Sequence, residues 1–247
     1  MSLRGGWGSR QGIARPALWP PRIRHGISVP MTQNMPQIEP LSPDAIETLF
    51  TRGDGQFLFA RWGRPIVPVV FGVTDETVAI LKGAIEALCV LTGHKMAETD
   101  PELGVNLMVF FVRDWAELPV TPNLDRLIPD LGALTDRLQA AEANQYRIFR
   151  FDESGAIKAC FAFLRMDDEL AQVPADTLAL NQMVQALLLW SDKAFTDASP
   201  LALLEGRAVL RPDVADLMRA AYDPVLPAMA QDPSHALRLF ARTGRVQ

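Results

Sequence analysis

The feature that most constrains the fold of this chain is an apolar run from about Leu178 to Asp192 that contains three amide side chains. The run leaves no polar stripe at helical spacing, and a helix that is apolar on all sides is buried. It is at the short limit for a membrane span, and its amides argue against that use. An acidic residue, Asp176, stands where it would favour the positive end of a helix. We therefore predict a central buried helix.

The amides of this helix form a pattern that invites comparison with zinc peptidases. Asn181 and Gln185 are four residues apart and share one face. In the zinc-peptidase helix, two His at this spacing hold the metal, and a Glu beside the first is the general base. Amides are weak zinc ligands, and Gln182 at the base position cannot take a proton from water. We predict a buried polar network with no metal, no cofactor and no catalytic residue. The candidate binding residues are Asn181, Gln182, Gln185 and Asp192.

Composition divides the chain into two parts. The sequence is 49% hydrophobic and 21% charged, which is typical of a soluble globular protein. Residues 1–30 contain Arg but no acidic residue, so the remainder is strongly acidic and lacks the basic face that nucleic acid needs. We interpret residues 1–40 as a disordered basic segment, or as sequence upstream of the true start, and residues 41–247 as a single α+β domain. Because no secretory signal is recognisable, we expect a cytoplasmic protein without a membrane span.

Helix and strand signals alternate along the rest of the chain. Pro68 removes a ladder donor, so its strand is expected at a sheet edge or beside a bulge. We expect a mixed sheet of four to five strands packed against helices. The expected strands are 57–62, 66–71, 106–112, 146–151 and 156–165; the expected helices start at Ser42, Thr74, Arg211 and Ser234, with two short helices or one kinked helix within 114–145. Residues 201–204 are interpreted as a leucine-rich turn.

The remaining chemistry-bearing residues receive structural interpretations. Cys89 and Cys160 lie in apolar runs and are interpreted as buried free thiols, with a bridge left open if the chain is exported. His94 follows a helix end, where a basic residue favours the helix dipole. His235 is interpreted as a surface residue near a helix start. The carboxylates of residues 167–169 are interpreted as a solvated turn or a helix start.

The chain resembles an uncharacterised proteobacterial domain-of-unknown-function family, many of whose members look like exported proteins or lipoproteins. In that family a Glu-Glu-x-x-Gln-Ala-Leu-Gly-Leu helix is followed by an Asp, and the sequence from Asn181 to Leu189 with Asp192 stands in its place. The resemblance implies a mixed sheet packed on a helix related to that of zinc peptidases. Both family glutamates are amides here, which implies a degenerate member that keeps the scaffold. The likeness covers about residues 57–230 and includes Arg61–Pro65, Leu91–Gly93, Asn106–Phe110, Asp152–Ile157 and Arg219–Pro224.

Three functional hypotheses follow. The first is a non-catalytic protein that binds a protein or peptide partner along its sheet edge or beside Asn181 and Gln185. The second is a hydrolase with non-standard residues, for which Asp192, Gln185 and Asp223 are candidates; a Ser-His-Asp arrangement would have to use His94. The third is small-molecule binding at a buried polar face. A nucleotide is not expected, since neither standard Gly-rich phosphate loop occurs.

Overall fold

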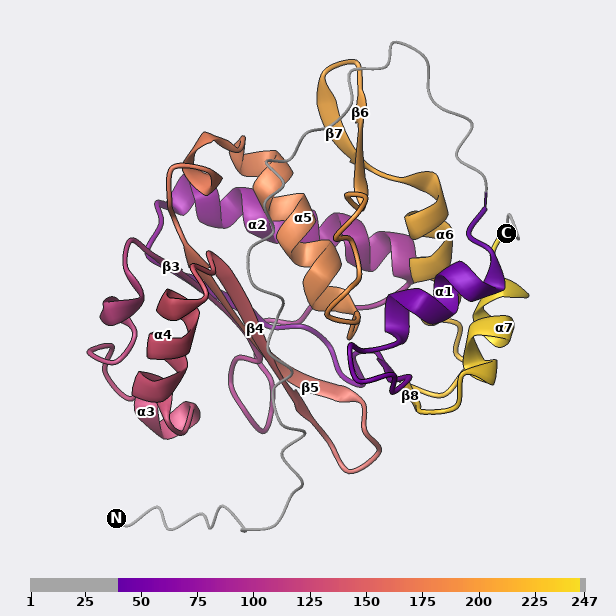
Figure 1. Ribbon diagram of the computed structural model, residues 1–247, viewed down its shortest axis with the longest axis horizontal. Helices are drawn as coiled ribbons and strands as arrows, with labels where there is room; N and C mark the ends of the chain where they lie inside the picture. The colour runs from indigo at the N-terminus through magenta and orange to yellow at the C-terminus, as the bar shows by residue number, and fades with distance from the viewer. Residues whose placement is uncertain (1–39, 245–247) are drawn as a thin grey trace.

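The computed structural model describes residues 40–244, and its main element is a four-stranded mixed sheet (Figure 1). The strand order is β2–β3–β5–β4, formed by β2 (Pro68–Phe71), β3 (Leu107–Val112), β5 (Ile157–Arg165) and β4 (Gln145–Phe151). The first three strands are parallel, and β4 is antiparallel to β5. The predicted α+β class with a mixed sheet is confirmed, and so is the edge position of the strand that contains Pro68. The prediction for the basic N-terminal segment falls on residues 1–39, which lie outside the described residues.

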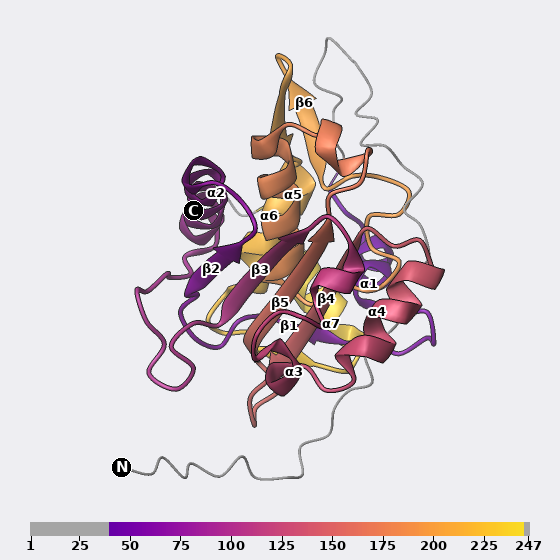
Figure 2. The ribbon, with the colours of Figure 1, turned by 90° about the vertical axis from the view of Figure 1, so that its left-hand side faces the viewer.

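Helices cover both faces of this sheet. The long helix α2 (Asp75–Thr92) and the central helix α5 (Ala175–Leu187) pack on one face, and α3 (Leu124–Leu127) and α4 (Leu131–Ala140) lie on the opposite side (Figure 2). Side chains of β3 alternate between the two apolar clusters, as the pleat of a strand requires. Because both faces are covered, β3 is apolar at every position.

Local capping signals set the starts of the N-terminal helices. In α1 (Pro43–Phe50), the hydroxyl of Ser42 accepts a hydrogen bond from the Ala45 backbone N–H at 3.2 Å. Thr74 caps α2 in the same way, and Gly93 ends α2 in the left-handed region with φ of 68°. These boundaries agree with those that the sequence predicts.

The expected strand over residues 57–62 is much shorter in the structure. Only β1 (Phe59–Ala60) is regular, and it pairs with β8 (Met229–Ala230). The helix α6 (Pro212–Ala221) follows as expected, and the last helix, α7 (Ser234–Phe240), packs against α1. Short 3-10 turns η1 (Trp115–Glu117) and η2 (Leu170–Gln172) complete the fold. The Asp167 carboxylate accepts from the Leu170 N–H at 2.9 Å, which confirms the helix-start interpretation of this acidic segment.

Residues 201–210 form a β-hairpin, so the prediction of a leucine-rich turn is wrong. The hairpin consists of β6 (Leu201–Leu204) and β7 (Arg207–Leu210) and projects beyond the helices at the top of Figure 1. Its two turn residues, Glu205 and Gly206, have φ values of 51° and 79°. Positive φ at both central residues is the geometry that matches the twist of two paired strands.

Two further predictions can be compared with the structure. Cys89 and Cys160 are both buried and free, as expected. Within residues 40–244, no helix combines the length and the apolarity that crossing a lipid bilayer requires.

Candidate functional site

The candidate site lies where the central helix α5 packs against the edge strand β4. Strand alternation directs Tyr146 and Ile148 into the apolar cluster beneath α4, and it directs Gln145 and Arg147 towards α5. The amides of α5 therefore face polar side chains of the sheet. Gln182 is 1% exposed and Gln185 is 6% exposed, whereas Asn181 is half-buried. The prediction of a buried helix is confirmed, since nine of the 13 residues of α5 are buried.

A continuous hydrogen-bond network joins these side chains, and we call it the Arg147–amide cluster. Arg147 donates from its two terminal nitrogens to the Oε1 atoms of Gln185, at 3.1 Å, and of Gln182. The Oε1 atom of Gln145 accepts from Gln182 at 3.1 Å and from Arg147 at 3.5 Å. At the outer end, Gln185 donates to Oδ1 of Asn181 at 2.6 Å. Helix and strand are thus connected through one guanidinium and four amides.

The cluster places a buried cation against amide dipoles. Burial lowers the pKa of Arg147 to about 10, and the nearby Cys160 opposes this shift. The guanidinium therefore remains protonated at neutral pH. Burial also raises the pKa of the Cys160 thiol to about 12, so this cysteine is neutral. The site combines a fixed positive charge with amide oxygens directed towards it.

The helix of the site is shorter than the apolar run that predicts it. Leu188 is extended, with φ of −130°, and pairs with Arg61, so residues 188–192 are not helical. Side chains from elsewhere in the chain satisfy the last carbonyls of α5. Donors at 2.9, 2.9 and 2.7 Å reach the carbonyls of Val184, Ala186 and Leu187, and they belong to Trp190, Trp62 and Tyr222.

Asp192 does not join the Arg147–amide cluster, because the helix ends before it. Its carboxylate accepts from the Gly53 N–H at 2.8 Å and lies near the charge of Arg52. It therefore stabilises the loop after α1. Three of the four predicted binding residues come together in the structure, and Asp192 is separated from them by the extended residues 188–191.

The residues of the alternative hydrolase arrangement also have structural partners. Asp223 binds Nε of Arg242 at 2.6 Å. The Nε2 atom of the half-buried His94 lies 3.0 Å from the carbonyl oxygen of Arg64, and its ring lies 5.0 Å from that of Tyr222. Burial lowers the pKa of His94; the hydrogen bond to the Arg64 carbonyl opposes this shift, and the charge of Arg61 adds to it. His94 thus stabilises the segment after α2.

The surface placement of His235 is wrong. The side chain is 1% exposed, and its ring centroid lies 4.5 Å from that of Phe59. The helix α7 is only seven residues long and presses its first turn against the core. Position at a helix start therefore gave no guide to burial.

Two residues of the site were not anticipated from the sequence, and both are on β4. The alternation of residues 146–151 predicts one buried and one polar face for this strand. The polar face, which includes Gln145 and Arg147, is in fact covered by α5. Two features of the sequence could have predicted this contact. Buried amides need hydrogen-bond partners, and β4 carries an amide and a cation two residues apart on one face.

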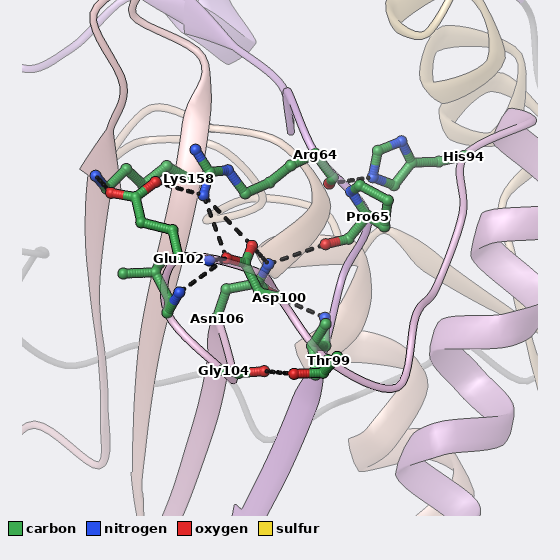
Figure 3. A network of polar contacts seen from close by, with 11 residues as sticks. Arg64, Pro65, His94, Thr99, Asp100, Glu102, Gly104, Asn106 and Lys158 are labelled. Atoms are coloured by element: carbon green, nitrogen blue, oxygen red, sulfur yellow. Dashed lines mark hydrogen bonds and ion pairs between the residues drawn. The ribbon is translucent and has the colours of Figure 1, made fainter.

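A second arginine-centred network lies at the other side of the sheet (Figure 3). Arg64 approaches both oxygens of Asp100 at 3.4 Å and Oε2 of Glu102 at 2.9 Å, and Lys158 binds Glu102 at 2.6 Å. Asn106 is buried, donates to Asp100 at 3.0 Å, and accepts from the Val67 N–H at 2.7 Å. This network fixes the loop that precedes β3.

No group of three or more His, Cys, Asp or Glu side chains in residues 40–244 is arranged to hold a metal ion. The oxygen atoms gathered at the Arg147–amide cluster belong to amides and are directed towards a guanidinium. Comparison with protein-family models, with curated proteins and with solved structures gives no match to this chain.

Proposed function

We propose that this chain is a non-catalytic protein with a zinc-peptidase-like scaffold, and that its function is to bind an extended polypeptide along the outer edge of β4. One observation carries the non-catalytic part of the proposal. Arg147 donates hydrogen bonds to the amides at a metal-ligand position, Gln185, and at the general-base position, Gln182. An organic cation is therefore bound by the helix face that would hold a metal in a zinc peptidase.

The chemistry of this arrangement opposes both halves of metal-dependent hydrolysis. A protonated guanidinium repels a second cation at close range, and more strongly in a buried site than in water. Neither an amide nor a guanidinium whose pKa is about 10 can accept a proton from water at neutral pH. The mixed sheet packed on α5 supports the likeness to a peptidase scaffold, while the residue types support a different use of it.

The hydrogen-bond pattern of β4 supports the binding surface. Arg165 donates its backbone N–H to the Asn144 carbonyl at 2.8 Å, which sets the alternation along the antiparallel pair. Tyr146, Ile148 and Arg150 then use their backbone groups for β5, whereas the partly exposed Phe149 directs its own outwards. No strand of the described residues pairs with this outer edge. An extended segment can add to such an edge through main-chain hydrogen bonds.

The first test separates binding from hydrolysis. The purified chain is analysed for bound zinc and assayed on a peptide and ester panel, with and without added zinc. We expect neither stoichiometric zinc nor turnover, and the same result for the Gln185→Ala variant. Turnover in the unaltered chain that disappears in Gln185→Ala would establish the hydrolase alternative and refute our proposal.

The second test concerns the surface. A random peptide display library is selected on the purified chain, and amide exchange of β4 is measured with and without the selected peptide. We expect protection at Phe149, whose N–H group points outwards. Phe149→Pro removes an outward donor and should weaken binding at least tenfold, whereas the control Phe149→Leu keeps the donor and should retain it. Equal binding by the two variants, or protection elsewhere only, would rule out the β4 edge.

A further inference from the structure

The structure contains a second buried polar group that the proposed function does not use, namely His235 in the first turn of α7. It is 1% exposed and lies against the ring of Phe59, with centroids 4.5 Å apart. Neither ring nitrogen has a hydrogen-bond partner within residues 40–244. Burial without partners is tolerable for a neutral imidazole and far more costly for an imidazolium, which has a charge and two donors.

The charged groups around His235 add to this cost. Arg238 of the same helix and Arg242, two residues after its end, act on the ring as positive charges. The charges of neighbouring elements are bonded elsewhere or exposed. Asp232 caps α7 through the Ser234 N–H at 2.8 Å. In α1, Asp44 and Glu47 are exposed. In α6, Asp213 binds Arg211 and Asp216 binds Arg219. Asp223 binds Arg242, and Arg61 donates to the Leu226 carbonyl.

The attachment of α7 is slight. The helix has seven residues, and besides His235 only Ala236 and Leu239 are buried. An ion pair between Arg242 and Asp223 at 2.6 Å joins the segment after α7 to the segment after α6. Such a terminal element can detach without unfolding the sheet. We propose that α7 is an acid-released latch, which neutral His235 keeps closed on α1 and Phe59 and which opens when the ring is protonated.

The pH window follows from the sign of the shift. Burial first, and then Arg238 and Arg242, lower the pKa of His235 from 6.5 to about 4. The closed state therefore binds fewer protons than the open state, and closure weakens as pH falls from 6.5 towards 4. At pH 5 this difference favours opening about 20-fold relative to neutral pH. Opening separates α7 from Phe59 and from α1.

The test measures the ring and the helix separately in the full chain. The His235 ring is titrated by NMR, and exchange protection of the α7 amides is measured from pH 7 to pH 4.5, corrected for intrinsic exchange. We expect protection of α7 to fall about 20-fold between pH 7 and pH 5, while β3 and β5 stay protected. The matched variant His235→Phe keeps the packing against Phe59 and should change less than threefold over the same range.

Two results would overturn the latch. One is a wild-type ring that titrates near 6.5 while α7 remains protected, because closure and protonation would then be uncoupled. The other is a pH response of His235→Phe equal to that of the wild-type chain. The wild-type titration decides the question even if the variant does not fold.

Discussion

The two arginine-centred networks of this protein stabilise a positive charge in opposite ways. Arg64 is partly exposed, with 24% of its side chain accessible, and lies between the buried carboxylate of Asp100 and the exposed carboxylate of Glu102. Arg147 is buried beneath α5, where amide oxygens accept its hydrogen bonds. Burial disfavours the charge of Arg64, but Glu102 and Asp100 outweigh it and raise the pKa, whereas burial lowers the pKa of Arg147 to about 10.

The difference shows which network depends on its exact partners. A surface ion pair that loses a partner is rehydrated, so little free energy is at stake. Water does not reach a buried guanidinium or the amides around it, so each group left without a partner costs about 1–3 kcal/mol of stability. Because Asp100 keeps its hydrogen bonds from Glu102, Leu103 and Asn106 when Arg64 is lost, substitution of Arg64 should cost less stability than substitution of Arg147.

The largest effect is expected from Arg147→Met. The change leaves the Oε1 atoms of Gln182 and Gln185 without their donor in a buried place. We expect a loss of about 3 kcal/mol in the free energy of unfolding, measured by urea denaturation. The matched variant Arg64→Met should lose clearly less. Equal losses for the two variants would break the comparison.

A compensated variant sharpens this result. In Arg147→Met combined with Gln145→Leu, Gln182→Leu and Gln185→Leu, the whole cluster becomes apolar at similar volume. Replacing all partners of a buried polar network removes the unsatisfied groups, so we expect most of the lost stability to return. If the fourfold variant is less stable than Arg147→Met alone, the cost arises from packing and not from unpaired amides.

A smaller effect, with a distinct pH dependence, is expected from Asp100→Asn. Burial alone would raise the pKa of Asp100, but hydrogen bonds from Leu103, Glu102 and Asn106, together with Arg64, lower it below 3.8. A lowered carboxyl pKa contributes stability that is present above pH 3.8 and is lost as pH falls through the folded-state value.

We therefore expect Asp100→Asn to cost about 2 kcal/mol at pH 7 and to approach the wild type below pH 3.8. Urea unfolding at pH 7, 5 and 3 measures the difference. A gap between wild type and variant that stays constant over this range would show that the charge of Asp100 contributes nothing.

The sequence predicts those parts of the fold that local signals determine. Ser42, Thr74 and Gly93 act within one helical turn, and the boundaries that they set are correct. The hairpin of β6 and β7 has Glu205–Gly206 at its turn, which is a weaker signal than Asn-Gly or Asp-Gly. The end of α5 has no local signal, because Trp62 and Tyr222 come from distant segments.

The sequence predicts the residues that α5 contributes to the candidate site, but not those that β4 contributes. The spacing of Asn181 and Gln185 predicts a shared face, and that face exists. Their connection to Arg147 depends on which face of β4 the helix covers, and alternation alone does not choose between the faces. The resemblance places an Asp after the helix, which makes Asp192 a candidate, but tertiary contacts end α5 at Leu187 and Asp192 lies apart from the cluster.

The smallest effect is expected at the exposed end of the Arg64 network, where Lys158 binds Glu102. Lys158 binds Glu102 at 2.6 Å, but 53% of the Glu102 side chain is exposed, so water replaces this ion pair at little cost. Lys158→Met should change the melting temperature by about 2 °C or less at low salt, and by less in 1 M NaCl, where such charges are screened. Differential scanning calorimetry at both salt concentrations measures this change. A larger loss that persists in salt would mean that Lys158 stabilises the loop before β3 by packing along β5, and that the two networks differ less than their exposure indicates.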